Sequence, residues 1–122
     1  MKILESAENY LETIYVLKKE MGEVRAIDIA NHLGFSKPSI STAMKMLREN
    51  GYITINKSKY IALTKAGLDV ALKIHERHHI LVEFFKSIEV SEETALEDAC
   101  KIEHYISNET FDKLKEYLAK KK

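Results

Sequence analysis

Apolar residues recur at three- and four-residue intervals along most of this chain, a pattern typical of amphipathic helices. Serine and threonine residues precede several of these stretches as N-caps, and glycines follow them as stops. The third stretch also has Pro38 in its first turn, where the missing amide hydrogen costs nothing. Six helices are predicted in this way, namely residues 6–20, residues 26–33, one between Ser36 and Gly51, residues 65–88, one after Ser91 and one after Ser107.

The same spacing predicts which side chains face the core. On the helix between Ser36 and Gly51, the apolar stripe leaves small, polar or basic residues on the opposite side. The last three lysines of the chain are expected to form a frayed, solvated end. The inward positions of the third, fifth and sixth helices are Ile40, Ala43, Met44, Leu47, Ala95, Ala99, Ile102, Ile106, Phe111, Leu114 and Leu118.

Two short runs rich in β-branched and aromatic residues interrupt the helical pattern. These runs, residues 52–56 and 60–63, flank the short polar segment 57–59 and therefore predict a β-hairpin. Two short helices joined by a glycine-containing turn and followed by a hairpin give the order of a winged helix-turn-helix. The predicted fold is mainly α, with a winged helix-turn-helix domain at residues 1–64 and a second, helical domain at residues 65–122.

Length and composition place the chain among ordinary globular proteins. It has 122 residues, of which 45% are hydrophobic and 31% charged, enough for one domain-sized core. The sequence contains no uncharged apolar run of membrane-spanning length, and its amino-terminal segment lacks the apolar core of a secretory signal. A single cysteine, Cys100, cannot form an internal disulfide, which is typical of a reducing compartment. We therefore expect a cytoplasmic protein with no membrane partner.

The net charge of zero conceals an uneven distribution of charge. Residues 25–65 contain seven basic and two acidic residues, a net charge of +5, whereas residues 76–122 have a net charge of −3. Counterion release depends on the side chains at the interface rather than on the whole protein, so a basic segment suffices for phosphate contact. Because this segment coincides with the predicted helix-turn-helix and hairpin, double-stranded DNA is the expected partner.

The helix between Ser36 and Gly51 is the expected recognition helix. Its small, polar or basic outward residues suit entry into a major groove, while serines, lysines and arginines around it suit contacts to the phosphate backbone. Taken singly, each residue is also consistent with an ordinary solvated surface, and only the joint pattern favours DNA binding. The expected DNA-binding residues are Arg25, Ser36, Lys37, Pro38, Ser39, Ser41, Thr42, Lys45, Arg48, Lys57 and Lys59.

Five residues of the helical half have the spacing of metal ligands. His79 and Glu83 stand four positions apart on one predicted helix, so both project from one face. Cys100, Glu103 and His104 repeat this arrangement on the next helix. Thiolate, carboxylate and imidazole groups on one surface are the donors that divalent transition metals prefer.

The first helix adds Asn9 and Glu12 as donors if it lies beside the other two helices. Mixed nitrogen, oxygen and sulfur donors suit Fe(II), Mn(II), Co(II), Ni(II) or Zn(II) better than Mg(II) or Ca(II). The structural alternative stays open, because a single cysteine is commonly a small buried hydrophobe and His–Glu pairs at this spacing stabilise helices. His32, His75 and His78 lack a matching cluster and are expected at the surface or at an interface.

Six segments of the chain together resemble one known family. They are residues 8–15 (ENYLETIY), 28–30 (DIA), 36–41 (SKPSIS), 63–67 (LTKAG), 79–83 (HILVE) and 98–104 (DACKIEH). Over nearly the whole chain, they are similar to the diphtheria-toxin-repressor and manganese-transport-regulator family of metal-dependent transcriptional repressors. The resemblance implies a homodimer with two winged heads, dimerised through the C-terminal helices. Residues 1–64 would then be the DNA-binding domain, and residues 65–122 the helical dimerisation and metal-binding domain. It also implies binding to operator DNA when Fe(II) or Mn(II) fills sites between the first, fourth and fifth helices.

The resemblance carries a ligand set onto this chain, with departures. Asn9 stands where iron-type members have methionine and manganese-type members have aspartate. Cys100 is iron-like and Glu12 is manganese-like, while Leu96 stands where iron-type members have a histidine ligand. The implied metal is therefore Fe(II) or Mn(II), with other divalent transition metals able to bind in vitro. The implied ligands are Asn9, Glu12, His79, Glu83, Cys100, Glu103 and His104.

The expected function is metal-gated repression of transcription in metal-ion homeostasis, with no small organic substrate. One alternative is a winged-helix regulator that is not gated by metal, in which His79, Cys100 and His104 are structural. An enzyme is disfavoured, although Glu83 or Glu103 could act as a base beside a metal-bound water. The reason is that the chain contains no glycine-rich phosphate loop and no Ser–His–Asp set.

Overall fold

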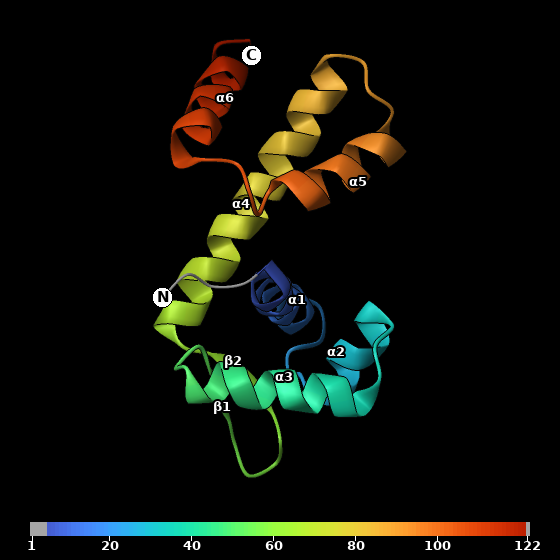
Figure 1. The fold of residues 1–122 in the computed structure, drawn as a ribbon, viewed down its shortest axis with the longest axis vertical. Coiled ribbons are helices and arrows are strands. Elements are labelled where there is room, and N and C mark those ends of the chain that lie inside the picture. The colour runs from blue at the N-terminus through green and yellow to red at the C-terminus, as the bar shows by residue number, and fades with distance from the viewer. Residues whose placement is uncertain (1–4, 122) are drawn as a thin grey trace. The chain divides into compact units, whose positions relative to one another are not determined.

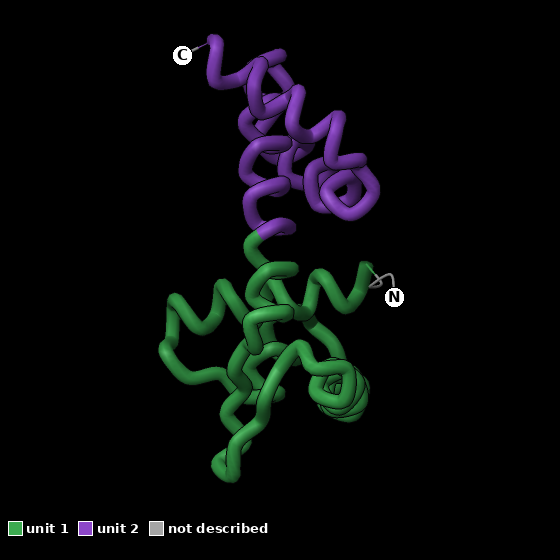
Figure 2. The backbone as a smooth tube through the Cα atoms, turned by 90° about the vertical axis from the view of Figure 1, so that its left-hand side faces the viewer, with its two compact units in different colours: residues 1–72 green, residues 73–122 purple. Residues whose placement is uncertain are grey.

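The computed structural model describes residues 5–121, which form six helices and one two-stranded sheet (Figure 1). The chain divides into two compact units, residues 1–72 (unit 1) and residues 73–122 (unit 2), coloured separately in Figure 2. None of the described helices is long and apolar enough to cross a lipid bilayer. The elements in chain order are α1 (Glu5–Met21), α2 (Ala26–Leu33), α3 (Lys37–Glu49), β1 (Ile53–Ile55), β2 (Ile61–Leu63), α4 (Lys65–Ser87), α5 (Glu92–Ile102) and α6 (Asn108–Lys121).

Local sequence signals set the end of α2 and the start of α3. Gly34 ends α2 with a left-handed φ of 74°, and its amide donates to the carbonyl oxygen of Ala30 at 2.9 Å. Ser36 begins α3, because its Oγ accepts a hydrogen bond from the amide of Ser39 at 3.3 Å. The mainly α, winged helix-turn-helix fold is confirmed, and where both ends of a helix were predicted they agree to within one residue.

Strands β1 and β2 form the predicted hairpin, here called the wing (residues 53–63). Asn56 closes the loop of the wing, because its side-chain oxygen accepts hydrogen bonds from the amides of Ser58 and Tyr60 at 3.0 and 2.9 Å. Lys59, between these two residues, adopts a left-handed φ of 71°. The exposed loop therefore has a defined conformation fixed by one asparagine side chain.

The wing is also tied to the linker that precedes α2. Val24 in this linker forms an isolated antiparallel bridge with Ile61 of β2, whose amide donates to the carbonyl oxygen of Val24 at 2.7 Å. Both side chains are buried. The wing and the start of α2 thus share backbone hydrogen bonds as well as a core.

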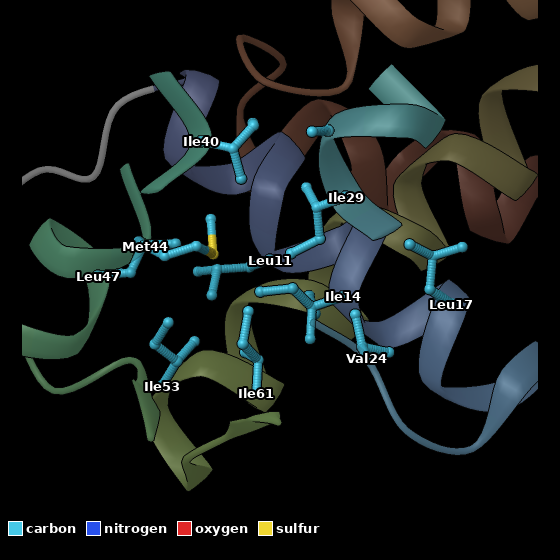
Figure 3. Packing of buried hydrophobic residues seen from close by; sticks show 12 residues of the cluster. Leu11, Ile14, Leu17, Val24, Ile29, Ile40, Met44, Leu47, Ile53 and Ile61 are labelled. Atoms are coloured by element: carbon cyan, nitrogen blue, oxygen red, sulfur yellow. The ribbon is translucent and has the colours of Figure 1, made fainter. Parts of the chain in front are cut away.

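One hydrophobic core holds unit 1 together, with contributions from α1, α2, α3 and the wing (Figure 3). Burial of each large apolar side chain contributes roughly 1.5–3 kcal/mol. The inward stripe predicted for α3 is confirmed, with Ala43 partly buried at its edge. The main core residues are Leu11, Ile14, Leu17, Val24, Ile29, Ile40, Met44, Leu47, Ile53 and Ile61.

The start of α4 presses closely on the backbone that precedes the wing. Thr64 Oγ1 accepts the amide of Gly67 at 3.2 Å and donates to the carbonyl oxygen of Gly51 at 2.6 Å. The Thr64 amide donates to the carbonyl oxygen of Tyr52 at 3.0 Å. A Cβ on Gly67 would collide with that same oxygen. A glycine is therefore required at this position for steric reasons rather than for its backbone conformation.

In unit 2 the inward face of α5 differs from the prediction at two positions. Ile106 lies beyond the end of the helix at Ile102 and is only half-buried. Ala95 and Ala99 are fully buried as predicted, but Ile102 is 39% exposed. Glu103 takes the inward place instead, with 1% exposure, because it stands four residues after Ala99 and so continues the buried stripe. The predicted inward positions of α6 are confirmed for Phe111, Leu114 and Leu118, the second of these being partly buried.

Arg77 of α4 joins the ends of α5 and α6 inside unit 2. One guanidinium nitrogen donates to the carbonyl oxygens of Glu103 and Ile106 at 3.1 and 2.8 Å, and the other donates to Asn108 Oδ1 at 2.6 Å. The guanidinium also lies 5.6 Å from the ring centre of Phe111. Arg77 is only 4% exposed, so its charge has lost most of its hydration. These hydrogen bonds compensate for that loss.

Helix α6 extends further than its lysine-rich end suggested. Lys120 and Lys121 were expected in a frayed end but lie in the last turn of α6, where cations interact favourably with the helix dipole. Lys122 lies outside the described residues.

A hydrogen bond joins α6 to α4, because Lys115 Nζ lies 2.7 Å from Glu76 Oε2. This hydrogen bond raises the pKa of Lys115 above its ordinary value.

Candidate functional site

A concave groove of about 590 Å³ lies in unit 1 between the start of α2, α3 and the wing. Its charged lining is basic, and none of the described aspartate or glutamate side chains lines it. A concave surface with charges of one sign concentrates ions of the opposite sign, here a polyanion. The lining residues are Arg25, Ala26, Ile27, Lys37, Ser41, Met44, Arg48, Ile55, Lys57, Ser58, Lys59 and Ile61.

Arg25 is held in this groove by the two elements that meet there. Its guanidinium lies 4.5 Å from the ring centre of Tyr60 in the wing, a cation–π contact that limits its motion. Its amide donates to Asp28 Oδ2 at 2.8 Å. The carboxylate of Asp28 is therefore engaged at the start of α2, although it is one of the two acidic residues in the basic segment.

The predicted DNA-binding residues fall into two groups in the structure. Six of them line the groove together: Arg25, Lys37, Ser41, Arg48, Lys57 and Lys59. The remaining five are exposed between the N-cap and the second half of α3, outside the groove lining: Ser36, Pro38, Ser39, Thr42 and Lys45. Within the second group, the Ser36 hydroxyl donates to Ser39 Oγ at 2.8 Å and the Thr42 hydroxyl donates to the carbonyl oxygen of Pro38 at 3.1 Å.

Glu103 is the centre of a buried polar cluster in unit 2. Its Oε2 lies 2.8 Å from His78 Nδ1, and its Oε1 lies 3.5 Å from His104 Nε2. The side chains of Glu103 and His104 are each 1% exposed, and that of His78 is 26% exposed. A carboxylate withdrawn from water requires polar partners, and here it has an imidazole beside each oxygen.

The remaining predicted ligands of unit 2 lie elsewhere on α4 and α5. His79 Nε2 is 3.2 Å from His75 Nε2, and Glu83 and Cys100 are exposed. Within residues 5–121, no three histidine, cysteine, aspartate or glutamate side chains are placed so that they could hold one metal ion. Of the predicted ligands in unit 2, Glu103 and His104 lie close to one another, whereas His79 lies beside His75, which was not a predicted ligand.

His75 and His78 were expected at the surface or at an interface, but both are half-buried and each contacts a predicted ligand. His75 stands four residues before His79, and the spacing argument that paired His79 with Glu83 would have found it. No sequence signal points to His78, because its contact with Glu103 depends on how α5 packs against α4. His32 is exposed on α2, as predicted.

Comparison with known protein families identifies the chain. Residues 2–61 match the family described as iron-dependent repressor, N-terminal DNA-binding domain, and residues 64–122 match the one described as iron-dependent repressor, metal-binding and dimerisation domain. The chain belongs to the iron-dependent repressor family. The family resemblance inferred from the sequence segments is therefore confirmed.

Individual relatives of this family member are transcriptional regulators by name. The transcriptional regulator MntR of Escherichia coli O6:H1 is 37% identical over 108 residues, which cover 88% of this chain and 70% of that protein. An HTH-type transcriptional regulator of Methanocaldococcus jannaschii with no established function is 34% identical over 121 residues, 95% of this chain and 94% of that protein. Family and relatives are thus transcriptional regulators rather than enzymes.

Solved structures share the fold of the iron-dependent repressor described here. A manganese-dependent transcriptional repressor in complex with manganese superposes with a TM-score of 0.84 at 23% identity, over 93% of this chain and 52% of that one. The manganese regulator SloR gives a TM-score of 0.80 at 24% identity. The chain spans about half the length of these solved structures, since it covers 52% and 53% of them.

The donor groups of this family member fit a divalent transition ion in their chemistry. Glu103 Oε1 and His104 Nε2 lie 3.5 Å apart. Two ligands each about 2.1 Å from one tetrahedral ion are separated by roughly 3.4 Å. This calculated separation is close to the one observed between Glu103 and His104. The predicted ligands Asn9 and Glu12 are half-buried on α1, in unit 1. Within unit 2, the buried Glu103–His104 pair is therefore a predicted ligand pair at the spacing that one ion requires.

Proposed function

We propose that this protein is a metal-dependent, DNA-binding transcriptional repressor that controls metal-ion homeostasis. The observation that supports this most strongly is the acid-free basic groove between α3 and the wing. It lies on a chain that matches both domains of the iron-dependent repressor family. No ester or phosphoester chemistry and no small organic substrate is part of the proposal.

In this proposal, α3 enters the major groove of double-stranded operator DNA and the wing contacts the flanking backbone. The exposed residues in the first half of α3 are small, polar or basic, so this half of the helix can approach base edges without an acidic obstacle. Basic side chains of the groove neutralise phosphates and set the position of the head. The proposed DNA-binding residues are Arg25, Ser36, Lys37, Pro38, Ser39, Ser41, Thr42, Lys45, Arg48, Lys57 and Lys59.

The proposed co-repressor is Fe(II) or Mn(II), held by Asn9, Glu12, His79, Glu83, Cys100, Glu103 and His104. A divalent ion would supply positive charge among carboxylates that otherwise repel one another. Glu12 comes from α1 and Glu83 from α4, so their neutralisation would favour one arrangement of the DNA-binding and metal-binding halves. Thermodynamic linkage requires the two effects to be equal. If bound metal raises the affinity for DNA by some factor, bound DNA raises the affinity for metal by the same factor.

We also propose that the protein is a cytoplasmic homodimer, joined through a helical domain at residues 65–122, with DNA binding at residues 1–64. Unit 2 exposes large apolar side chains for its size, including Tyr105 at 75% and Ile88 at 54%. Their burial against a second copy would remove apolar surface from water. A two-fold dimer would present two heads to a pseudo-palindromic site.

Selection of genomic DNA fragments under four anaerobic conditions tests this function. The protein is incubated with fragments in chelator, Fe(II), Mn(II) or Zn(II), and affinities for retained fragments are then measured at one fixed salt concentration. The expected result is retention that requires Fe(II) or Mn(II). Equal retention in chelator would overturn metal gating, and no retention in any condition would overturn DNA binding.

A matched pair of histidine variants connects the gating to the proposed ligands. His104→Ala removes a buried donor beside Glu103 and is expected to abolish the response to metal while leaving chelator-state DNA binding unchanged. His32→Ala removes an exposed histidine of α2, outside the groove and the ligand set, and is expected to respond to metal as the unaltered protein does. A full metal response in His104→Ala would overturn the ligand assignment.

A second candidate function is winged-helix regulation without metal. It is favoured by the engagement of Glu103 with His78 and by the absence of a three-ligand group within residues 5–121. In this reading, His79, Cys100 and His104 stabilise the helices. The chelator arm of the selection separates the two functions, because only the second predicts undiminished binding there.

A further inference from the structure

His75 and His79 form a facing pair on α4 that the proposed metal site does not account for. They stand four residues apart, one turn along the helix. Their Nε2 atoms are 3.2 Å apart, their ring centres 4.6 Å apart, and the ring planes meet at 88°. Both nitrogens thus point at the same small volume beside the helix.

This separation is the one that two imidazole ligands of a single ion require. With metal–nitrogen distances of about 2.0–2.1 Å, two ligand atoms are roughly 3.0 Å apart at a right angle and roughly 3.4 Å apart at the tetrahedral angle. The observed 3.2 Å lies between these values. The two side chains would hold an ion with little change in their positions.

We propose that His75 and His79 form a two-histidine clip for a divalent ion that prefers imidazole, such as Ni(II), Cu(II) or Zn(II). Neutral imidazoles bind such ions well and bind Mn(II) weakly, following the order in which these metals form complexes. In the metal-free pair, one ring donates its Nε2 hydrogen to the other. On binding, that ring carries its hydrogen on Nδ1 instead, so no net proton is released. Water completes the coordination.

Two polar residues adjacent to the clip in sequence have partners of their own. Glu76, next to His75 in sequence, is bonded to Lys115 at 2.7 Å. His78, next to His79, lies 2.8 Å from Glu103. The clip therefore has two protein ligands, consistent with the absence of a three-ligand group within the described residues. His79 is exposed and His75 half-buried, so an ion can reach the pair from solvent.

The clip would compete with the proposed co-repressor site for one residue. His79 can pair with Glu83 on one side or with His75 on the other, and each stands four residues away. An ion held by two imidazoles would withdraw His79 from Glu83. This consequence, discrimination against imidazole-seeking metals, rests on the proposed function, whereas the clip itself does not.

Titration of the full chain with Ni(II) or with Mn(II), near neutral pH, tests the clip. Three variants are compared: His75→Gln, Glu83→Gln and His32→Gln. We expect His75→Gln to weaken Ni(II) binding by at least about tenfold. His32→Gln is expected to leave Ni(II) affinity unchanged, and His75→Gln is expected to leave Mn(II) affinity unchanged. Glu83→Gln is expected to weaken Mn(II) binding. Calorimetry gives the affinities, and histidine ring NMR signals locate the Ni(II).

Each outcome decides between defined alternatives. Loss of Ni(II) affinity in Glu83→Gln but not in His75→Gln would overturn the clip and assign Ni(II) to the His79–Glu83 pair. Unperturbed ring signals of His75 in the presence of bound Ni(II) would also overturn it. Neither result bears on metal-gated DNA binding, and failure of the chelator experiment above would leave the clip intact.

Discussion

Removal of the two wing lysines gives a quantitative test of the proposed groove. The double variant Lys57→Gln and Lys59→Asn deletes two of the five cations that line it. Asparagine is chosen at position 59 because the lysine there has a φ of 71°, and asparagine tolerates this left-handed conformation better than most residues. The loop should therefore keep its shape while it loses charge.

The magnitude follows from counterion release. If the five lining cations each neutralise one phosphate, the logarithm of the affinity falls with the logarithm of the salt concentration with a slope of about −4.5 per head. With three cations the slope is about −2.7. Between 50 and 200 mM salt, the unaltered head would lose roughly 500-fold in affinity and the variant roughly 40-fold. The ratio of slopes, about three fifths, is the same for one head or two.

Fluorescence anisotropy with a labelled duplex, at five or more salt concentrations and saturating Mn(II), measures both slopes. The matched control is Lys18→Gln with Lys19→Gln, which deletes the same charge from the last turn of α1 outside the groove lining. Its slope should equal that of the unaltered protein. An unchanged slope in the wing variant, or an equal reduction in the control, would refute the reasoning.

Two further substitutions test packing and the buried cluster. Gly67→Ala should destabilise the protein by about 1–2 kcal/mol in urea unfolding, because a clash with the Tyr52 carbonyl oxygen outweighs the gain of about 1 kcal/mol in helix propensity; greater stability would contradict this. His78→Ala should weaken Mn(II) binding about 10- to 100-fold, because Glu103 loses the hydrogen bond that orients it. His78→Asn keeps a nitrogen donor near the Nδ1 position and should therefore retain much of the Mn(II) affinity. Equal losses of affinity in both variants would show that the hydrogen bond is not the cause.

The fold was predictable where local chemistry decides it. The end of α2 follows from the glycine after it, and the start of α3 follows from the serine before it. Both signals act within a single turn. The inward face of α5 was not fully predictable. A pattern of apolar positions selects Ile102, whereas the buried stripe of Ala95 and Ala99 continues to Glu103. Its buried carboxylate has the imidazoles of the adjacent His104 and of His78 on α4 as partners.

The candidate sites also divide into features that local sequence decides and features that depend on tertiary packing. The basic groove could be inferred from the lysines and arginines concentrated in one segment. Burying their charges would be costly, so they are expected at the surface of that segment. The role of Asn56 in the wing and the stacking of Arg25 on Tyr60 could not, because each depends on how the loop closes. Likewise, the partner of His78 is set by the packing of two helices and not by any spacing along one.

The wing is organised before any partner arrives, and this bears on the kinetics of recognition. An unstructured loop would lose roughly 1–2 kcal/mol of backbone freedom per residue on becoming ordered. Here the Asn56 side chain and the Val24–Ile61 bridge have already fixed the hairpin during folding. Encounter with a polyanion is therefore not coupled to loop ordering, so association can proceed at a rate set by diffusion and electrostatic steering.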